Sequence, residues 1–180
     1  MKKRVLCLLA PGFEEIETIA PVDLLRRANA EVVMASVAGD RLVAGRCGIS
    51  VQADATLAEV ESQPFDLLFI PGGPGVKALR DDGRAAKLAK AYAQASRPVT
   101  AICAAPLVLA DAGLLAGKRF TAHFSVHAQL PGVLANERVV KDGIIITSRG
   151  AGTAVEFGLA LVRELFGESK AAEIADAIML

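Results

Sequence analysis

The sequence predicts an α/β fold, in which helices cover both faces of a mostly parallel β-sheet. Segments of β-prone residues alternate with segments of helical pattern along the chain, which is the element order of such proteins. The strand candidate Leu67–Ile70 is short and wholly apolar, as strands are in the interior of a parallel sheet. Hydrophobic residues make up 53% of the chain and aromatic residues only 4%, so we expect an aliphatic core.

The first quarter of the chain predicts a strand, a helix, a second strand and a hairpin. An unbroken apolar run predicts the strand Arg4–Ala10, and an acidic first turn opens the helix Glu14–Ala28. The β-branched segment Glu31–Val37 predicts the second strand. Glycines around short β-prone pieces indicate a hairpin in Gly39–Gln52.

The middle of the chain continues the alternation. A short helix is predicted at Leu57–Glu61, before the apolar strand Leu67–Ile70. The alanine-rich segment Arg84–Ala95 has a strong helical pattern. The strand Val99–Ile102 follows, and then a helix at Pro106–Ala112 with proline in its first turn.

The last third predicts weaker strands and two terminal helices. Arg119–Thr121 and Val139–Lys141 give weak strand signals, whereas Ile144–Thr147 gives a clear one. The segments Val155–Phe166 and Ser169–Met179 are predicted helices. Sites in open parallel sheets form at the carboxyl ends of strands, so we expect the chemistry there.

Length and charge narrow the class of protein. The 180 residues are enough for one well-buried domain, predicted over residues 1–180. Lys plus Arg and Asp plus Glu number 20 each, a balance that gives no reason to expect binding to nucleic acid or to a membrane. The apolar run near the start is too short for a signal peptide. Three cysteines without paired spacing favour a reducing, cytoplasmic compartment.

Cys103 is the strongest candidate for chemistry, because it lies at a corner between the strand Val99–Ile102 and the helix Pro106–Ala112. A thiol at a helix start lies beside the positive end of the helix dipole, which favours the thiolate. The small neighbours Ala101 and Ala104 permit the strained turn of a nucleophile elbow. The sequence therefore predicts a reactive cysteine, and the alternative is a buried, inert one.

Glu17 is the candidate acid. On the predicted helix it shares a side with Phe13 and Leu24, so its carboxyl group is expected to point toward an apolar face. A desolvated carboxyl group has a raised pKa and can donate a hydrogen bond to a thiolate. The alternative is a solvated first-turn glutamate, which is the interpretation that we adopt for Glu14 and Glu15.

His123 follows the weak strand Arg119–Thr121, at the expected rim of the sheet. There its side chain could reach Cys103 as a base or an orienting group, although a lone histidine is more often a structural group. His127 lies four residues further on, and two histidines at this spacing can bind zinc. No third ligand is nearby and no HExxH pattern occurs, so no metal site is predicted.

Two glycine-rich turns follow predicted strands. Pro71–Gly75 has neither the P-loop pattern nor the dinucleotide spacing, and is better suited to close approach of bare backbone. The N–H groups of Gly73 and Ala104 could form an oxyanion hole, and the alternative is a plain turn. In the second turn, Thr153 and Glu156 have the spacing of a helix capping box.

The other two cysteines receive a structural interpretation. Cys7 lies in the first predicted strand and is expected to be inert core. Cys47 lies in the glycine-rich segment, where it can be exposed or at an interface.

Five segments, in order, resemble the ThiJ/PfpI superfamily, and most closely the branch of the Parkinson disease protein deglycase and bacterial YajL. They are APGFEEIETIAPVDLLRRA at 10–28, DLLFIPGG at 66–73, AICAAP at 101–106, TAH at 121–123 and KDGIIITSRGAGTAVEFGLALV at 141–162. The resemblance implies a flavodoxin-like three-layer sandwich and a homodimer. It also implies Cys103 as nucleophile, Glu17 as the protonated carboxyl group beside it, His123 nearby, and Gly73 and Ala104 as backbone donors.

The resemblance implies cofactor-free activity on reactive carbonyl compounds. The family is credited with converting methylglyoxal to lactate, a glyoxalase activity, and with deglycation of early adducts of amino acids, proteins and nucleotides. It is also credited with sensing oxidative stress through a cysteine sulfinic acid, and with chaperone activity. The chain departs from close relatives in the Pro74-Gly75 turn, at Arg46-Cys47 in the hairpin, and at Ala151, which replaces a proline.

Three functions therefore compete. The first is a glyoxalase or deglycase, in which Cys103 adds to a small-molecule carbonyl substrate. The second is a non-enzymatic redox sensor or chaperone, whose Cys103 oxidises to a sulfinate held by Glu17. The third is a cysteine peptidase or amidase, which ranks last because no acid partner for His123 is evident in the sequence.

Overall fold

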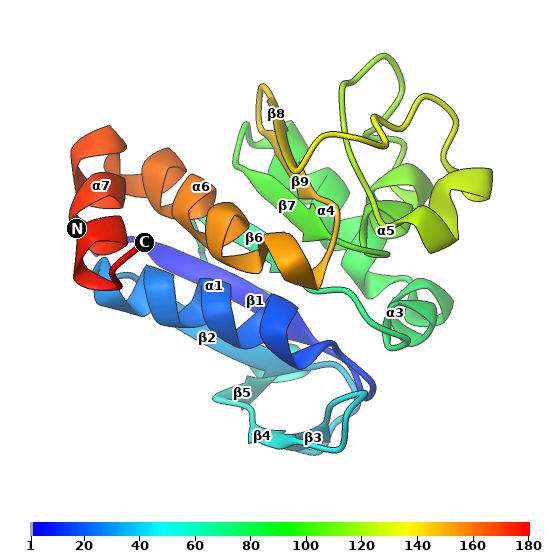
Figure 1. The fold of residues 1–180 in the computed structure, drawn as a ribbon. Coiled ribbons are helices and arrows are strands. Elements are labelled where there is room, and N and C mark those ends of the chain that lie inside the picture. Colours follow the sequence, from blue (N-terminus) through cyan, green and yellow to red (C-terminus); the bar gives the residue numbers. More distant parts are fainter. Residues whose placement is uncertain (1) are drawn as a thin grey trace.

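A seven-stranded sheet organises the computed structural model, which describes residues 2–180 and leaves Met1 outside (Figure 1). The strand order is β5-β2-β1-β6-β7-β9-β8, and every neighbouring pair is parallel except β8 and β9. The strands are β1 (Arg4–Leu9), β2 (Glu31–Ser36), β5 (Ala55–Thr56), β6 (Leu67–Ile70), β7 (Val99–Ile102), β8 (Val139–Asp142) and β9 (Ile145–Ser148). β3 (Leu42–Ala44) and β4 (Ser50–Gln52) form a separate hairpin. The predicted α/β fold and hairpin are confirmed.

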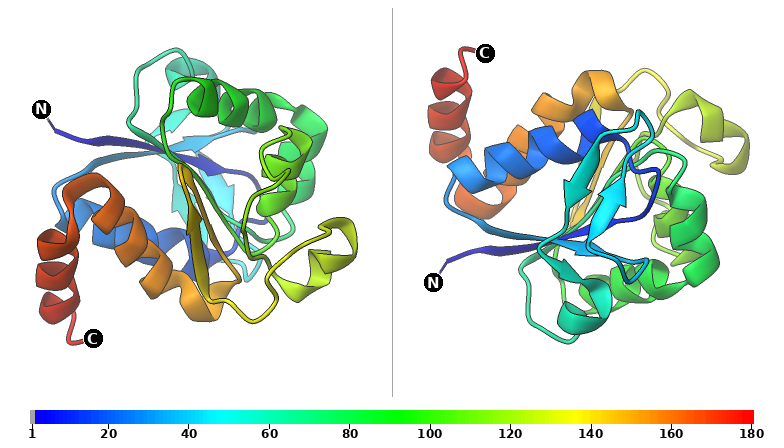
Figure 2. Two further views of the ribbon diagram at one scale, coloured as in Figure 1. Left: turned by 90° about the horizontal axis from the view of Figure 1, so that it is seen from above. Right: turned by 90° about the horizontal axis from the view of Figure 1, so that it is seen from below.

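Helices cover both faces of this sheet, as Figure 2 shows. One face packs against α1 (Glu15–Arg27) and α6 (Ala154–Phe166), with α7 (Glu168–Ala177) beside α6. The other face carries α2 (Leu57–Val60), α3 (Val76–Asp82), α4 (Arg84–Gln94) and α5 (Pro106–Asp111). Alternate residues of β1 serve the two cores: Leu6 and Leu8 on the α4 side, Val5 and Cys7 on the α1 side. This alternation is why the central strands are apolar throughout.

The predicted strand Arg119–Thr121 is wrong. β9 already has β7 on one side and β8 on the other, so no place in its ladder is left. Two N–H groups of the segment donate to side chains instead of to a neighbouring strand. The Arg119 N–H donates to Asp142 Oδ2 at 2.9 Å, and the Thr121 N–H donates to Thr147 Oγ1 at 2.9 Å. The helix α3 was not predicted, because only Val76 and Leu79 are buried in it and its apolar pattern is therefore weak.

Close packing of α1 against α6 fixes the position of the helix that carries Glu17. Gly158 of α6 lies so near α1 that a Cβ there would be 2.6 Å from Leu24 Cδ1 and 2.9 Å from Pro21 Cα. Only a residue without a side chain permits this approach. The contact presses the buried side of α1 onto the sheet, with its first turn at the carboxyl end of β1 and β6.

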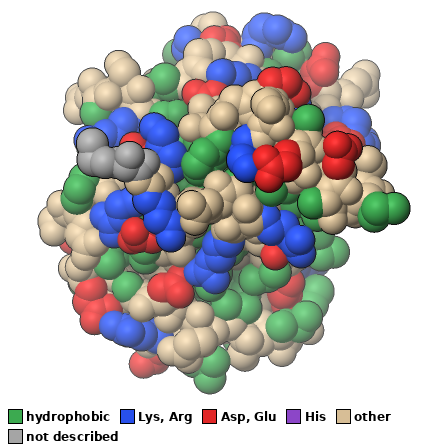
Figure 3. Space-filling view, turned by 90° about the vertical axis from the view of Figure 1, so that its left-hand side faces the viewer, with side chains coloured by type: hydrophobic (Ala, Val, Ile, Leu, Met, Phe, Trp, Pro, Cys, Tyr) green, Lys and Arg blue, Asp and Glu red, His purple; other side chains and the backbone are tan. Residues whose placement is uncertain are grey.

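The face of the molecule drawn in Figure 3 shows basic and acidic side chains intermixed. This distribution agrees with the net charge of zero. No helix within residues 2–180 has both the length and the apolar character that crossing a membrane requires.

Candidate active site

Cys103 occupies a strained corner directly after β7. Its φ is 65°, in the left-handed region that non-glycine residues rarely adopt. Two backbone hydrogen bonds fix the corner: the Cys103 N–H donates to the Ser148 carbonyl at 2.8 Å, and the Cys103 carbonyl accepts from the His123 N–H at 2.8 Å. Because the surrounding strands hold this geometry, the sulfur stays at the sheet edge at a cost of order 1–3 kcal/mol in strain.

Glu17 meets Cys103 across the backbone of Gly72. The Glu17 side chain is buried, with 1% of the residue exposed, and its Oε2 accepts the Gly72 N–H at 3.1 Å. A Cβ on Gly72 would overlap Glu17 Oε2 and would lie 2.6 Å from Cys103 Cβ. The missing side chain of Gly72 is therefore what allows the carboxyl group and the cysteine to approach each other.

The Glu17 carboxyl group and the Cys103 thiol hold their protons more tightly than free side chains do. Burial raises the pKa of Glu17 to about 7, against the hydrogen bond with Cys103, while the Glu14 charge raises it further. Burial, followed by the charge and hydrogen bond of Glu17, raises the pKa of Cys103 to about 12. The expected lowering of the thiol pKa is thus wrong. Because α5 is a short helix, the lowering of the pKa by its N-terminal end is smaller than the rise caused by burial beside a carboxylate. Near pH 7, Glu17 therefore exists in both its protonated and its ionised form, while Cys103 keeps its proton.

Backbone donors surround the sulfur. The N–H groups of Gly73 and Ala104 oppose the burial effect and lower the pKa of Cys103, which places both donors at the sulfur. Gly73 has φ 91°, and a Cβ there would lie 2.6 Å from the Glu14 nitrogen, so this position requires glycine. Gly73 and Ala104 also line a cavity of about 610 Å³ in front of α3 and α5. The donors can therefore serve an oxygen that approaches the sulfur from this cavity.

His123 lies on the other side of the corner. Its ring is partly exposed, and its Nδ1 accepts the Ser125 N–H at 3.3 Å and lies 2.8 Å from Ser125 Oγ. A backbone N–H can only donate, so the neutral ring carries its proton on Nε2. Burial, then Arg46 and His127, lower the pKa of His123, which keeps the ring neutral at pH 7. A Cβ on Gly150 would lie 3.3 Å from the ring and 3.9 Å from Glu17 Oε1, so ring and acid flank Gly150.

The interpretation of Glu14 and Glu15 as solvated first-turn residues is wrong, because both are buried. Glu14 caps α1, with its Oε2 accepting the Glu17 N–H at 2.7 Å. Glu15 lies under the hairpin loop, and its Oε1 accepts the Cys47 N–H at 2.8 Å. The capping role of Glu14 could have been predicted, because its side chain bonds a residue only three positions later. The contact of Glu15 could not, because it joins residues 32 positions apart in the sequence.

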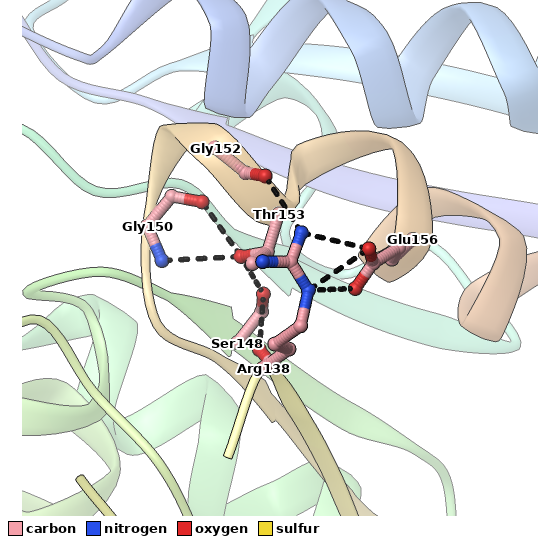
Figure 4. Close-up of polar contacts among 6 residues, drawn as sticks. All are labelled: Arg138, Ser148, Gly150, Gly152, Thr153 and Glu156. Carbon is pink, nitrogen blue, oxygen red and sulfur yellow. Dashed lines mark hydrogen bonds and ion pairs between the residues drawn. The ribbon is translucent and has the colours of Figure 1, made fainter. Parts of the chain in front are cut away.

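Thr153 is the N-cap residue of α6, as predicted, but the predicted capping box with Glu156 is wrong. Thr153 Oγ1 donates to the Gly150 carbonyl at 2.7 Å, and Glu156 instead binds the guanidinium of Arg138 (Figure 4). The side chain of Ser148 joins the same cluster, with its Oγ 2.6 Å from Thr153 Oγ1. The turn before α6 is therefore held by its own side chains rather than by a reciprocal cap.

The remaining candidates lie apart from this constellation. Cys7 is fully buried in β1, and burial raises the pKa of its thiol. Cys47 is exposed in the hairpin loop. His127 Nε2 lies 3.0 Å from the Ala122 carbonyl. Across residues 2–180 no three His, Cys, Asp or Glu side chains gather in a way that could hold a metal ion.

Comparison with known proteins finds one family and close structural relatives. The family model described as DJ-1/PfpI family matches residues 3–164. Protein dj-1beta of Drosophila melanogaster is 39% identical over 184 residues, which cover 100% of this chain and 98% of the relative. The Parkinson disease protein 7 homolog of Danio rerio is 35% identical, over 99% of this chain and 97% of the relative. The crystal structure of Drosophila melanogaster DJ-1beta superposes with a TM-score of 0.96 at 38% identity, covering 100% and 99% of the two chains.

Proposed function

The chain belongs to the DJ-1/PfpI family, in the DJ-1 branch, and from this premise we propose that it is a cofactor-independent glyoxalase and deglycase. Its substrates are small reactive carbonyls such as methylglyoxal and glyoxal, with their early adducts. The observation that carries the proposal is the buried Glu17 carboxyl group against Cys103, at a strained corner supplied with the N–H groups of Gly73 and Ala104. These are a nucleophile, a base and an oxyanion hole within one contact shell.

The first step forms the bond to sulfur. Glu17 takes the thiol proton as the sulfur of Cys103 adds to the aldehyde carbon of methylglyoxal, leaving negative charge on the former aldehyde oxygen. The N–H groups of Gly73 and Ala104 would stabilise this oxygen. Glu17 then returns the proton to it, which gives a hemithioacetal.

The second step moves hydrogen within the bound molecule. Glu17 removes the proton from the carbon bonded to sulfur and delivers it to the neighbouring carbon. The hydroxyl proton of the hemithioacetal passes to the former ketone oxygen, which the Nε2–H of His123 would bind. The product of this isomerisation is the thioester of lactate on Cys103. Water then cleaves the thioester, releasing lactate and restoring the thiol, so the overall reaction consumes one methylglyoxal and one water.

The direct test measures lactate from methylglyoxal by proton NMR. Cys103→Ser is expected to abolish lactate formation, and Glu17→Gln to reduce kcat at least ~100-fold, because a positioned acid–base group contributes about 10²–10⁴-fold. Cys7→Ser is the matched control, since Cys7 is fully buried in β1, and its turnover should equal that of the parent. Unchanged turnover in Cys103→Ser would refute the proposal.

A redox sensor is the second candidate, favoured by the same hydrogen bond between Glu17 and Cys103. Two equivalents of peroxide would convert the thiol to a sulfinic acid with release of two waters, and protonated Glu17 would donate to the new oxygens. Intact-mass measurement after mild peroxide separates the two functions. Addition of two oxygens at Cys103 with negligible carbonyl turnover favours the sensor, and turnover without such oxidation favours the enzyme.

A peptidase is the weakest candidate. A cysteine–histidine peptidase orients its histidine with an acid or amide, whereas the His123 ring binds Ser125.

We also propose that the protein is a homodimer. Ile16 and Ile19 on α1 are 57% and 40% exposed, and Ile49 in the adjoining hairpin loop is 59% exposed. The hairpin loop is bound to the start of α1 through Glu15, so these apolar side chains share one region of the surface. Light scattering on the purified protein should give twice the chain mass of 18.7 kDa, and Ile16→Glu should lower it to the monomer value.

A further inference from the structure

A second cavity adjoins the reactive corner on the side of His123. Its volume is about 490 Å³, and its walls include His123, Gly150, Arg138 and Arg149. Gly150 lies between the His123 wall of this cavity and the Glu17 carboxyl group, because the position of its missing Cβ is 3.3 Å from the His123 ring and 3.9 Å from Glu17 Oε1. Both flanking residues contact Cys103, since the His123 N–H donates to the Cys103 carbonyl and Glu17 hydrogen-bonds the thiol. A molecule bound at Cys103 would therefore need only a short arm to reach the cavity past Gly150.

The charge around this cavity is positive. Arg138 binds both carboxylate oxygens of Glu156 and the Gly152 carbonyl, so the carboxylate neutralises its guanidinium charge (Figure 4). Arg149 is partly buried, and within the described part of the chain its guanidinium has no acid at ion-pair distance. Glu156 is the acidic group near it, and that carboxylate is already bound by Arg138. One guanidinium charge therefore remains available to a ligand.

The floor of the cavity is rigid backbone that adds donors. Gly150, Ala151 and Gly152 form the turn that opens α6, and the Thr153 side chain binds both the carbonyl and the N–H of Gly150. The first N–H groups of a helical turn have no acceptor within that turn. The guanidinium of Arg149 is therefore the charged donor that this cavity offers to a carboxylate.

We propose that this cavity is a subsite for a carboxylate on the non-reacting end of the substrate, with Arg149 as the residue that binds it. The inference rests on the proposed function for its substrate class, which becomes 2-oxoaldehydes and related carbonyl compounds that carry an acidic arm. Arg149 does not touch the reacting atoms and acts on specificity.

The test compares two maleimides that alkylate Cys103, one neutral and one acidic. They are N-ethylmaleimide and 3-maleimidopropionate, used on the full chain in a Cys47→Ser background. The remaining thiols are then Cys103, with 7% of the residue exposed, and Cys7, which is fully buried. The ratio of the acidic to the neutral rate constant is expected to fall about fivefold in Arg149→Gln and to be retained in Arg149→Lys, since a partly exposed charge pair contributes only a modest factor. The control Arg119→Gln changes an exposed arginine outside the cavity and should keep the parent ratio.

An unchanged ratio in folded Arg149→Gln overturns the subsite. A second measurement needs no variant: salt must lower the ratio in the parent protein, because screening weakens attraction between charges, and a salt-independent ratio also overturns it.

Steady-state kinetics then separate this inference from the proposed function. The acidic probe is the 2-oxoaldehyde 4,5-dioxopentanoate, which carries a carboxylate arm, and methylglyoxal is its neutral counterpart. Arg149→Gln should weaken the apparent binding of the acidic substrate more than that of methylglyoxal, and equal changes for both substrates count against the subsite. If the parent converts neither substrate while the maleimide ratio still depends on Arg149, the glyoxalase proposal fails and the subsite stands.

Discussion

Replacing Glu17 by Gln should change the shape of the pH dependence of Cys103 alkylation. In the parent, Glu17 has a pKa of about 7, so the pair loses its first proton there and the carboxylate becomes able to take the thiol proton. The fraction of molecules in that state rises from ~0.1 at pH 6 to ~0.9 at pH 8, so the rate should rise about tenfold and level off. In Glu17→Gln no base titrates in this range, and the rate should rise about 100-fold over the same interval without levelling off.

The assay is alkylation by iodoacetamide, followed by mass spectrometry of the Cys103 peptide at each pH. Cys47 in the same digest is the internal control, because this exposed thiol should follow the same curve in both proteins. If Glu17→Gln keeps a plateau with a midpoint near pH 7, the titrating group is not Glu17 and the assigned role of this carboxyl group is refuted.

Three further predictions concern stability and packing. The raised pKa of Glu17, about 7 against an ordinary value of 4.5, contributes stability that is complete below about pH 4.5 and is lost as pH rises through 7. At pH 8, Glu17→Gln should therefore have a higher free energy of unfolding than the parent, by at most ~3 kcal/mol, as measured by denaturant titration. The difference should be smaller at pH 5, and a variant less stable than the parent at pH 8 would contradict this. Gly72→Ala should retain the fold by circular dichroism yet lose methylglyoxal turnover at least ~100-fold, since its Cβ must displace Glu17 or Cys103, and parent-like kinetics would disprove the contact. Gly158→Val should lower the free energy of unfolding by about 1–3 kcal/mol through overlap with Leu24, and an unchanged urea midpoint would show that α1 and α6 separate without cost.

The corner at Cys103 concentrates features that oppose stability. A left-handed cysteine, a buried carboxyl group and a buried thiol each have a free-energy cost, and two backbone hydrogen bonds from neighbouring segments keep them together. Such clusters are typical of functional sites, where a strained and desolvated arrangement is retained for its chemistry.

Much of the candidate site was open to prediction, because its members are marked by local sequence. Cys103 stands between an apolar strand and a helix, and Glu17 falls on the apolar side of its own helix, so both positions follow from nearest-neighbour pattern. Gly72 and Gly73 directly follow the apolar strand β6, which also locates them at the sheet edge.

The sequence alone determined the alternation of strands and helices, the apolar central strands and the corner that holds Cys103, because periodicity and turn residues act over a few positions. The tertiary structure decided what depends on distant partners. It placed Glu15 under a hairpin loop, and it left no position beside β9 for Arg119–Thr121. Within residues 2–180 it also placed no acid at ion-pair distance from Arg149, beside the His123 cavity. It also decided the protonation of the pair, since desolvation and the approach of Glu17 across Gly72 arise only when segments 55 residues apart are packed together.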